Sequence, residues 1–279
     1  MADGHFFIMN SLNNKPVGVF DSGVGGLTVA HAIKQILPDE ALVYFGDTAH
    51  LPYGDKSEGA IINYSRRITD FLIGHGAKLI LIACNSASAS AYSVLKKEYG
   101  QKVLLLDVIS PVIDYIATKN YSRVGVIGTK RTITSGTYEA GFGEKSPGTD
   151  VVSLATPLLV PMIEEGFIFD DISNAIIRTY LTDKKLEGIQ SLVLGCTHYP
   201  LIRNQISKFY NFDIEVVDSA RVVALELRGM LEENKLLNTG EKSTEDKFFV
   251  SDFTTYFEKI ARMFFDGGDI NLTVADIWN

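Results

Sequence analysis

Residues 79–86 read Leu-Ile-Leu-Ile-Ala-Cys-Asn-Ser, and residues 191–198 read Ser-Leu-Val-Leu-Gly-Cys-Thr-His. Each stretch is a short apolar run that stops at a cysteine, and polar residues follow the cysteine. A run that is apolar on both faces is typical of a strand in a parallel sheet, because helices cover such a sheet on both sides. The two stretches therefore predict two equivalent buried strands in an α/β protein, each with a thiol at its carboxyl end.

Six further runs of this kind give eight predicted strands in all. The strands are expected at 17–20, 42–45, 79–83, 103–106, 124–127, 151–154, 192–194 and 214–217. Helical patterns are expected at 27–37, 57–73, 87–98, 112–117, 132–140, 172–181, 201–209 and 220–233. Because strands and helices alternate strictly, the pattern predicts a doubly wound α/β architecture.

The two halves of this pattern follow the same order, with a cysteine closing the third strand of each half. We therefore expect two pseudo-symmetric, doubly wound lobes with parallel sheets and the active site in the cleft between them. The first lobe is expected at residues 1–109 plus 220–279, with the C-terminal segment returning to it, and the second at residues 110–219. Ligands bind at the carboxyl ends of the strands in such folds, so facing lobes bring both thiols to one cleft.

Composition limits the classes of protein that the chain can belong to. Of its 279 residues, 46% are hydrophobic and 22% are charged, and the net charge is −8. These proportions are typical of a globular protein, and an acidic surface repels nucleic acid and anionic membranes. Two cysteines cannot form a disulfide framework, and no stretch approaches the ~18 apolar residues of a transmembrane helix. We therefore expect a soluble cytoplasmic protein without nucleic-acid or membrane partners.

A glycine-rich loop follows the first predicted strand. Residues 21–27 read Asp-Ser-Gly-Val-Gly-Gly-Leu and lead into a helix, so backbone N–H groups and the helix dipole can hold an anion there. A dinucleotide fingerprint needs the spacing G-x-G-x-x-G, and Thr28 stands at its last glycine. We favour a carboxylate site over nucleotide binding, while glycines that serve only a tight turn are the remaining alternative.

The cysteines and Thr129 each allow a structural interpretation as well as a functional one. A free cysteine is by default a small buried hydrophobe, but Cys84 and Cys196 both stand one step past an apolar strand, where a ligand site is expected. A redox disulfide between them is not favoured, because the chain has no C-x-x-C motif. Zinc needs three or four ligands, and only Cys196 and His198 lie close together in the sequence, so no metal is expected. Thr129 either caps a helix or offers its hydroxyl group to a small substrate.

Four motifs resemble those of the glutamate racemases in the cofactor-independent aspartate/glutamate racemase superfamily. They are Asp21-Ser22-Gly23-Val24-Gly25-Gly26, Pro52-Tyr53-Gly54, Cys84-Asn85-Ser86-Ala87-Ser88 and Gly195-Cys196-Thr197-His198-Tyr199-Pro200. The resemblance runs from about residue 16 to residue 230. It implies interconversion of L- and D-glutamate without a cofactor, which supplies D-glutamate for peptidoglycan, with glutamate as the small-molecule partner. It leaves a homodimer as an open option.

The resemblance also implies roles for individual residues. Cys196 corresponds to the base that deprotonates L-glutamate and Cys84 to the base that deprotonates D-glutamate, with Asp21 and His198 as further catalytic residues. Substrate-binding positions fall on Asp21, Ser22, Pro52, Tyr53, Gly54, Asn85, Ser86, Thr129, Thr132, Thr197 and His198. Glu165 is either a carboxylate that supports the site from behind or part of a solvated acidic loop. Ser86 stands where threonine is usual and His50 where arginine is common.

The residue types suit this chemistry. Racemisation removes a proton from one face of Cα and returns one to the other, so two thiols on opposite faces suffice. A free thiol with a pKa of ~8.5 is only about 3% ionised at pH 7, so its neighbours must stabilise one thiolate. A protonated His198 would favour thiolate at Cys196, whereas an ionised Asp21 would oppose it at Cys84. The alternatives are a racemase for aspartate or another small acid, and a non-catalytic binding protein for an acidic amino acid.

Overall fold

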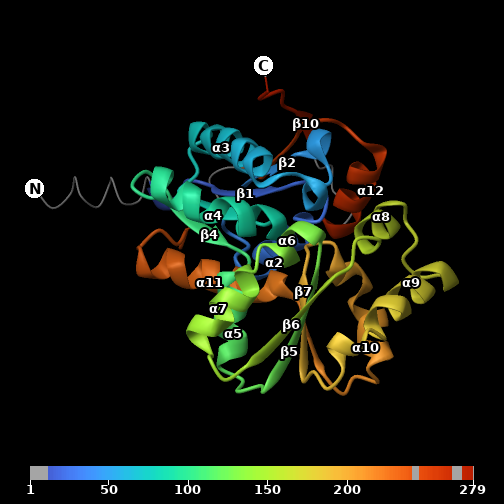
Figure 1. The fold of residues 1–279 in the computed structure, drawn as a ribbon. Coiled ribbons are helices and arrows are strands. Elements are labelled where there is room, and N and C mark those ends of the chain that lie inside the picture. The colour runs from blue at the N-terminus through green and yellow to red at the C-terminus, as the bar shows by residue number, and fades with distance from the viewer. Residues whose placement is uncertain (1–11, 241–244, 266–271, 279) are drawn as a thin grey trace, which may run out of the picture.

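A computed structural model of the chain describes residues 12–240, 245–265 and 272–278, and they form an α/β fold with two parallel sheets (Figure 1). The first sheet has the strand order β10-β9-β2-β1-β3-β4. Its strands are β1 (Val17–Asp21), β2 (Leu42–Gly46), β3 (Leu79–Ile82), β4 (Leu104–Asp107), β9 (Lys247–Val250) and β10 (Leu272–Val274). All of its pairings are parallel.

The second sheet repeats the central order of the first. Its strands are β5 (Arg123–Gly128), β6 (Asp150–Ala155), β7 (Ser191–Gly195) and β8 (Glu215–Val217). The order β6-β5-β7-β8 matches β2-β1-β3-β4, and these pairings are again parallel. The predicted fold class is confirmed, because each predicted strand is present and the third strand of each set lies beside the first.

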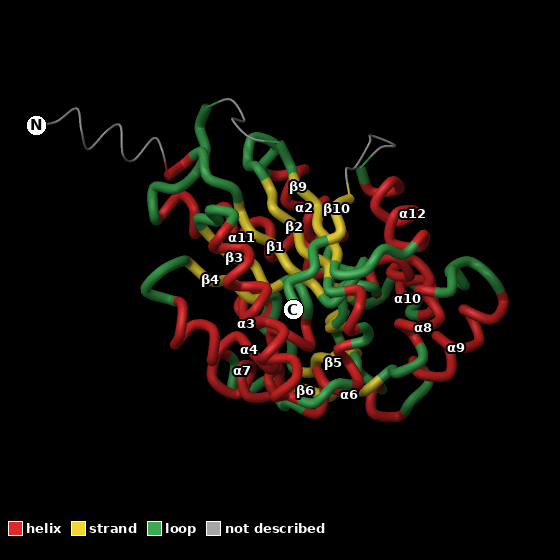
Figure 2. Tube along the Cα trace, turned by 90° about the horizontal axis from the view of Figure 1, so that it is seen from above, coloured by secondary structure: helices red, strands yellow, loops and turns green. Residues whose placement is uncertain are grey.

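Helices form three layers around the two sheets (Figures 1 and 2). One apolar core between the sheets contains α2 (Leu27–Ile36), α5 (Ser110–Ala117), α7 (Thr137–Lys145) and α11 (Ser219–Glu233). A second core lies under α3 (Glu58–Gly74) and α4 (Asn85–Tyr99) on the outer face of the first sheet. A third lies under α8 (Leu159–Glu164), α9 (Asp171–Leu181) and α10 (Arg203–Phe209) on the outer face of the second. Burial on both faces explains why the strands are apolar runs.

The structure differs from the sequence-based expectation in three places. The helix expected at 132–140 is divided into α6 (Lys130–Thr134) and α7, because Gly136 between them has a φ of 68°, which a helix does not accommodate. Helix α8 was not expected. Strands β9 and β10 and helix α12 (Thr255–Phe264) were not expected either, and β9 extends the first sheet by pairing with β2. The residue boundaries of the two lobes stay a prediction.

Candidate functional site

A narrow pocket lies where loops from the carboxyl ends of both sheets meet. Its lining residues are Ser22, Leu51, Pro52, Tyr53, Gly54, Cys84, Asn85, Ser86, Thr129, Val160, Cys196, Thr197 and His198. The cavity measures about 20 Å³, which is room for about one water molecule. The two cysteines follow β3 and β7, each of which lies beside the first strand of its set, where doubly wound sheets bind their ligands.

Both cysteines are free thiols that line this one pocket from different sheets. They are 5% and 6% exposed, so they are nearly closed off from solvent. Cys84 Sγ lies 3.7 Å from Ser22 Oγ, and Cys196 Sγ lies 3.7 Å from Nδ1 of His198. Among the described residues there is no cluster of three or more His, Cys, Asp or Glu side chains that could hold a metal ion.

The two thiols have different electrostatic surroundings. Burial, and then the nearby Asp21, raise the pKa of the Cys84 thiol to about 12, so Cys84 keeps its proton. Burial alone would lower the pKa of His198, but contacts with Cys196 and Glu164 outweigh it and raise that pKa well above its ordinary value. The raised pKa favours the protonated form of His198, whose Nδ1 lies 3.7 Å from Cys196 Sγ.

Asp21 lies behind the pocket wall and joins the two halves of the molecule. Its side chain is fully buried, and burial raises its pKa. One carboxylate oxygen accepts from the backbone N–H of Gly23 at 2.9 Å, and the other accepts from Thr197 Oγ1 at 3.2 Å. The latter bond runs from the end of β1 to the loop after β7, so Asp21 supports a residue of the opposite wall.

Hydroxyl and amide groups face one another across the pocket. Ser86 Oγ lies 2.9 Å from Thr129 Oγ1 and 3.3 Å from Thr132 Oγ1, which places Thr132 behind the wall. Asn85 is 2% exposed, and its Oδ1 accepts a 2.8 Å bond from the Tyr138 hydroxyl group. Asn85 Nδ2 has no partner among the described residues. A buried donor without a partner is costly, so this N–H group is suited to a carboxylate ligand.

The carboxylate that contacts His198 is Glu164, and not its neighbour Glu165, for which a solvated loop was the alternative. Glu164 Oε1 lies 3.0 Å from His198 Nε2, and Glu165 is exposed. Glu164 follows Val160 by four residues on α8, and residues with this spacing share one helix face. This four-residue spacing could have placed Glu164 beside Val160 only if α8 had been predicted as a helix.

The predicted site residues do not include Leu51 and Val160 of the pocket wall, or Asp47 behind it. The Tyr53 hydroxyl group donates to Asp47 Oδ2 at 2.6 Å. The hydroxyl proton of Tyr53 is therefore held in a hydrogen bond within the protein. The other predicted site residues line the pocket or, as for Asp21 and Thr132, contact residues that do.

Known proteins share this fold and this length of chain. A family model for Asp/Glu/Hydantoin racemase matches residues 27–227. The glutamate racemases of Chlorobaculum parvum and Neisseria gonorrhoeae are each 40% identical to the chain, over 89% and 90% of its length and 92% of their own. The crystal structure of glutamate racemase from Francisella tularensis in complex with D-glutamate has a TM-score of 0.88 at 38% identity, covering 95% of this chain and 99% of that one.

The fold and the pocket together define an α/β protein in which two similar parallel sheets contribute one thiol each to a shared polar cleft. The sequence matches extend over most of this chain and of its relatives. The chain belongs to the Asp/Glu/hydantoin racemase family.

Proposed function

We propose that this chain is a glutamate racemase that exchanges the Cα proton between two cysteines. The observation that carries the proposal is that Cys84 and Cys196 line one narrow pocket from two different sheets. Curated relatives at 40% identity over nine-tenths of the chain support glutamate as the substrate. D-glutamate made in this way would supply peptidoglycan synthesis.

In the direction from L- to D-glutamate, Cys196 is the base. Its thiolate, paired with the His198 imidazolium, takes the proton from Cα, and the electron pair of the broken C–H bond passes to the α-carboxylate as an enediolate. Cys84, whose raised pKa keeps it protonated, gives its proton to the opposite face of Cα. The product is D-glutamate with a thiol at Cys196 and a thiolate at Cys84, and proton exchange with solvent restores the first state.

The reverse direction needs a thiolate at Cys84. Asp21 disfavours that charge in the free protein, and a substrate ammonium group near Asp21 would offset the repulsion. Ionisation of Cys84 is thus coupled to substrate binding. The unpartnered Nδ2 of Asn85 and the hydroxyl groups of Ser86 and Thr129 are the donors that would hold substrate carboxylates, where exclusion of water strengthens each bond.

The mechanism requires both thiols in reduced form. A reducing compartment such as the cytoplasm therefore belongs to the proposal. In the part of the chain that the structure describes, no helix has both the length and the apolar character needed to span a bilayer.

A chiral assay with glutamate and aspartate side by side tests the proposal. We expect the purified protein to racemise glutamate with a higher kcat/KM than aspartate. Cys84→Ala and Cys196→Ala should each abolish conversion in both directions, because each direction uses one thiol as base and the other as acid. Equal or better activity on aspartate would overturn the substrate, and a Cys84→Ala variant with near wild-type rates would overturn the mechanism.

A further inference from the structure

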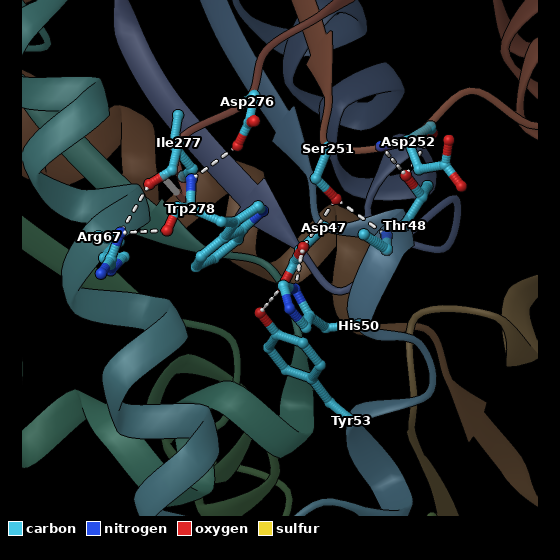
Figure 3. Close-up of polar contacts among 11 residues, drawn as sticks. Asp47, Thr48, His50, Tyr53, Arg67, Ser251, Asp252, Asp276, Ile277 and Trp278 are labelled. Carbon is cyan, nitrogen blue, oxygen red and sulfur yellow. Dashed lines mark hydrogen bonds and ion pairs between the residues drawn. The ribbon is translucent and has the colours of Figure 1, made fainter.

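The Asp47 carboxylate accepts hydrogen bonds from three side chains, one of which lines the pocket (Figure 3). It follows β2 and is fully buried. Its Oδ1 accepts from Ser251 Oγ at 2.7 Å, and its Oδ2 accepts from the Tyr53 hydroxyl group at 2.6 Å. His50 Nδ1 lies 2.9 Å and 3.0 Å from the two oxygens. A buried carboxylate needs such donors, so the position of each donor is tied to Asp47.

His50 and Tyr53 follow Asp47 in the same loop, whereas Ser251 comes from the segment after β9. Of the three donors, Tyr53 is the one that lines the pocket. Tyr53 is 1% exposed. Burial and the neighbouring Asp47 raise the pKa of Tyr53 well above its ordinary value, so the hydroxyl group stays protonated and donates to Asp47. Tyr53 therefore orients the loop 51–54, and its hydroxyl proton is not free for the substrate.

The end of the chain packs against the same group of residues. The His50 ring stacks on Tyr64 with centroids 4.1 Å apart, and the edge of Trp278 meets it at 4.5 Å. Arg67 Nη1 donates to the backbone carbonyl oxygens of Ile277 at 3.1 Å and of Trp278 at 2.9 Å. Figure 3 shows Trp278 beside His50.

We propose that Asp47 is a positioning residue for the pocket loop 51–54, and that Ser251 and the C-terminal residues 276–278 hold Asp47 and His50 in place. The end of the chain thereby sets the affinity for substrate without touching it. This inference rests on the proposed racemase function for its kinetic consequence. The contact network itself does not depend on that function.

Asp47→Asn tests the central residue. The amide keeps the size but loses the charge and replaces one acceptor by a donor, so it cannot accept from all three side chains. We expect kcat/KM for glutamate to fall about tenfold or more, mainly through a higher KM, and equally in both directions because the equilibrium constant of racemisation is one. Ser251→Ala, which removes a single donor, should raise KM in the same sense but less.

Thr48→Val is the matched control. Thr48 joins the same two loops through Asp252, whose backbone N–H donates to Thr48 Oγ1 at 2.9 Å. Thr48 is the chain neighbour of Asp47, but its hydroxyl group bonds to Asp252 and not to the Asp47 carboxylate. We therefore expect the KM of this variant to stay close to that of wild type. If Asp47→Asn and Ser251→Ala have the kinetic constants of Thr48→Val, the positioning role is wrong. Ser251→Ala decides alone if Asp47→Asn fails to fold.

Trp278 gives a readout that is independent of activity, because it is the only tryptophan in the chain. Asp47→Asn should make Trp278 emission easier to quench with acrylamide, and Thr48→Val should not. Trp278→Ala should raise KM. Trp278→Phe, which keeps a ring against His50, should have the KM and the melting temperature of wild type. The proposal would be overturned if neither the acrylamide quenching nor KM differed from wild type in these variants. A wild-type protein that does not racemise glutamate, yet shows the quenching difference, would overturn only the proposed function.

Discussion

His198 is the residue whose charge separates the roles of the two thiols. Contacts with Cys196 and then with Glu164, which is 25% exposed and 3.0 Å away, raise the pKa of His198. A histidine with a raised pKa contributes stability below its ordinary value of 6.5, and loses that contribution as the pH rises through the raised value. The same deprotonation removes the partner of the Cys196 thiolate, so activity should decline over the same alkaline range.

Glu164→Gln should move the alkaline limb of kcat/KM to lower pH by about one unit, because removing an opposite charge lowers the pKa of His198. The melting temperature should begin its alkaline decline earlier in the variant as well. Glu165→Gln is the matched control, since it changes the exposed neighbour on the same turn. The assignment of Glu164 would be contradicted by two identical pH profiles.

At the scale of elements, local pattern predicted most of what positions the site. The strands that end at Cys84 and Cys196 are buried on both faces, and such runs are readable from sequence. The strand β9 was not predicted because its four residues become a strand only through pairing with β2, which lies far away in sequence. The contacts of Asp47 with Ser251 and of His198 with Glu164 were not predicted for the same reason, because each joins segments that only the tertiary fold brings together.

The loop between β1 and α2 approaches the opposite wall so closely that only glycine fits at position 25. A Cβ there would lie 2.3 Å from Thr197 Oγ1 and 2.6 Å from His198 Nδ1. Gly25→Ala should therefore displace these site residues, and a shift of about 1 Å is expected to lower kcat/KM about 100-fold.

Gly229→Ala is the control for this prediction. Gly229 lies within α11, and no described residue outside its own stretch of helix has an atom within 4 Å of its ideal Cβ. We expect wild-type activity and about 0.5–1 kcal/mol of added stability, because alanine is the better helix former. Comparable kinetic constants for the Gly25→Ala and Gly229→Ala proteins would show that close approach at this loop does not matter for catalysis.

At the scale of the whole molecule, the pocket is closed in this structure. Its volume of about 20 Å³ is far smaller than glutamate, so the pocket must open to admit substrate. Thiol alkylation should therefore depend on opening, inactivate the protein, and be slowed by saturating glutamate. The measurement is the rate of inactivation by a neutral alkylating agent with and without glutamate. Inactivation at one rate under both conditions would contradict a shared cleft for thiols and substrate.

Hydrogen exchange in D₂O tests whether the two cysteines act on opposite faces of Cα. Starting from L-glutamate, initial-rate samples are separated by chirality, and the deuterium at Cα is measured in each enantiomer by mass spectrometry. We predict that the D-glutamate carries deuterium from the first turnover while the remaining L-glutamate stays mostly protonated. D-glutamate that retains the original proton at Cα would mean that a single base serves both faces, and would contradict the account.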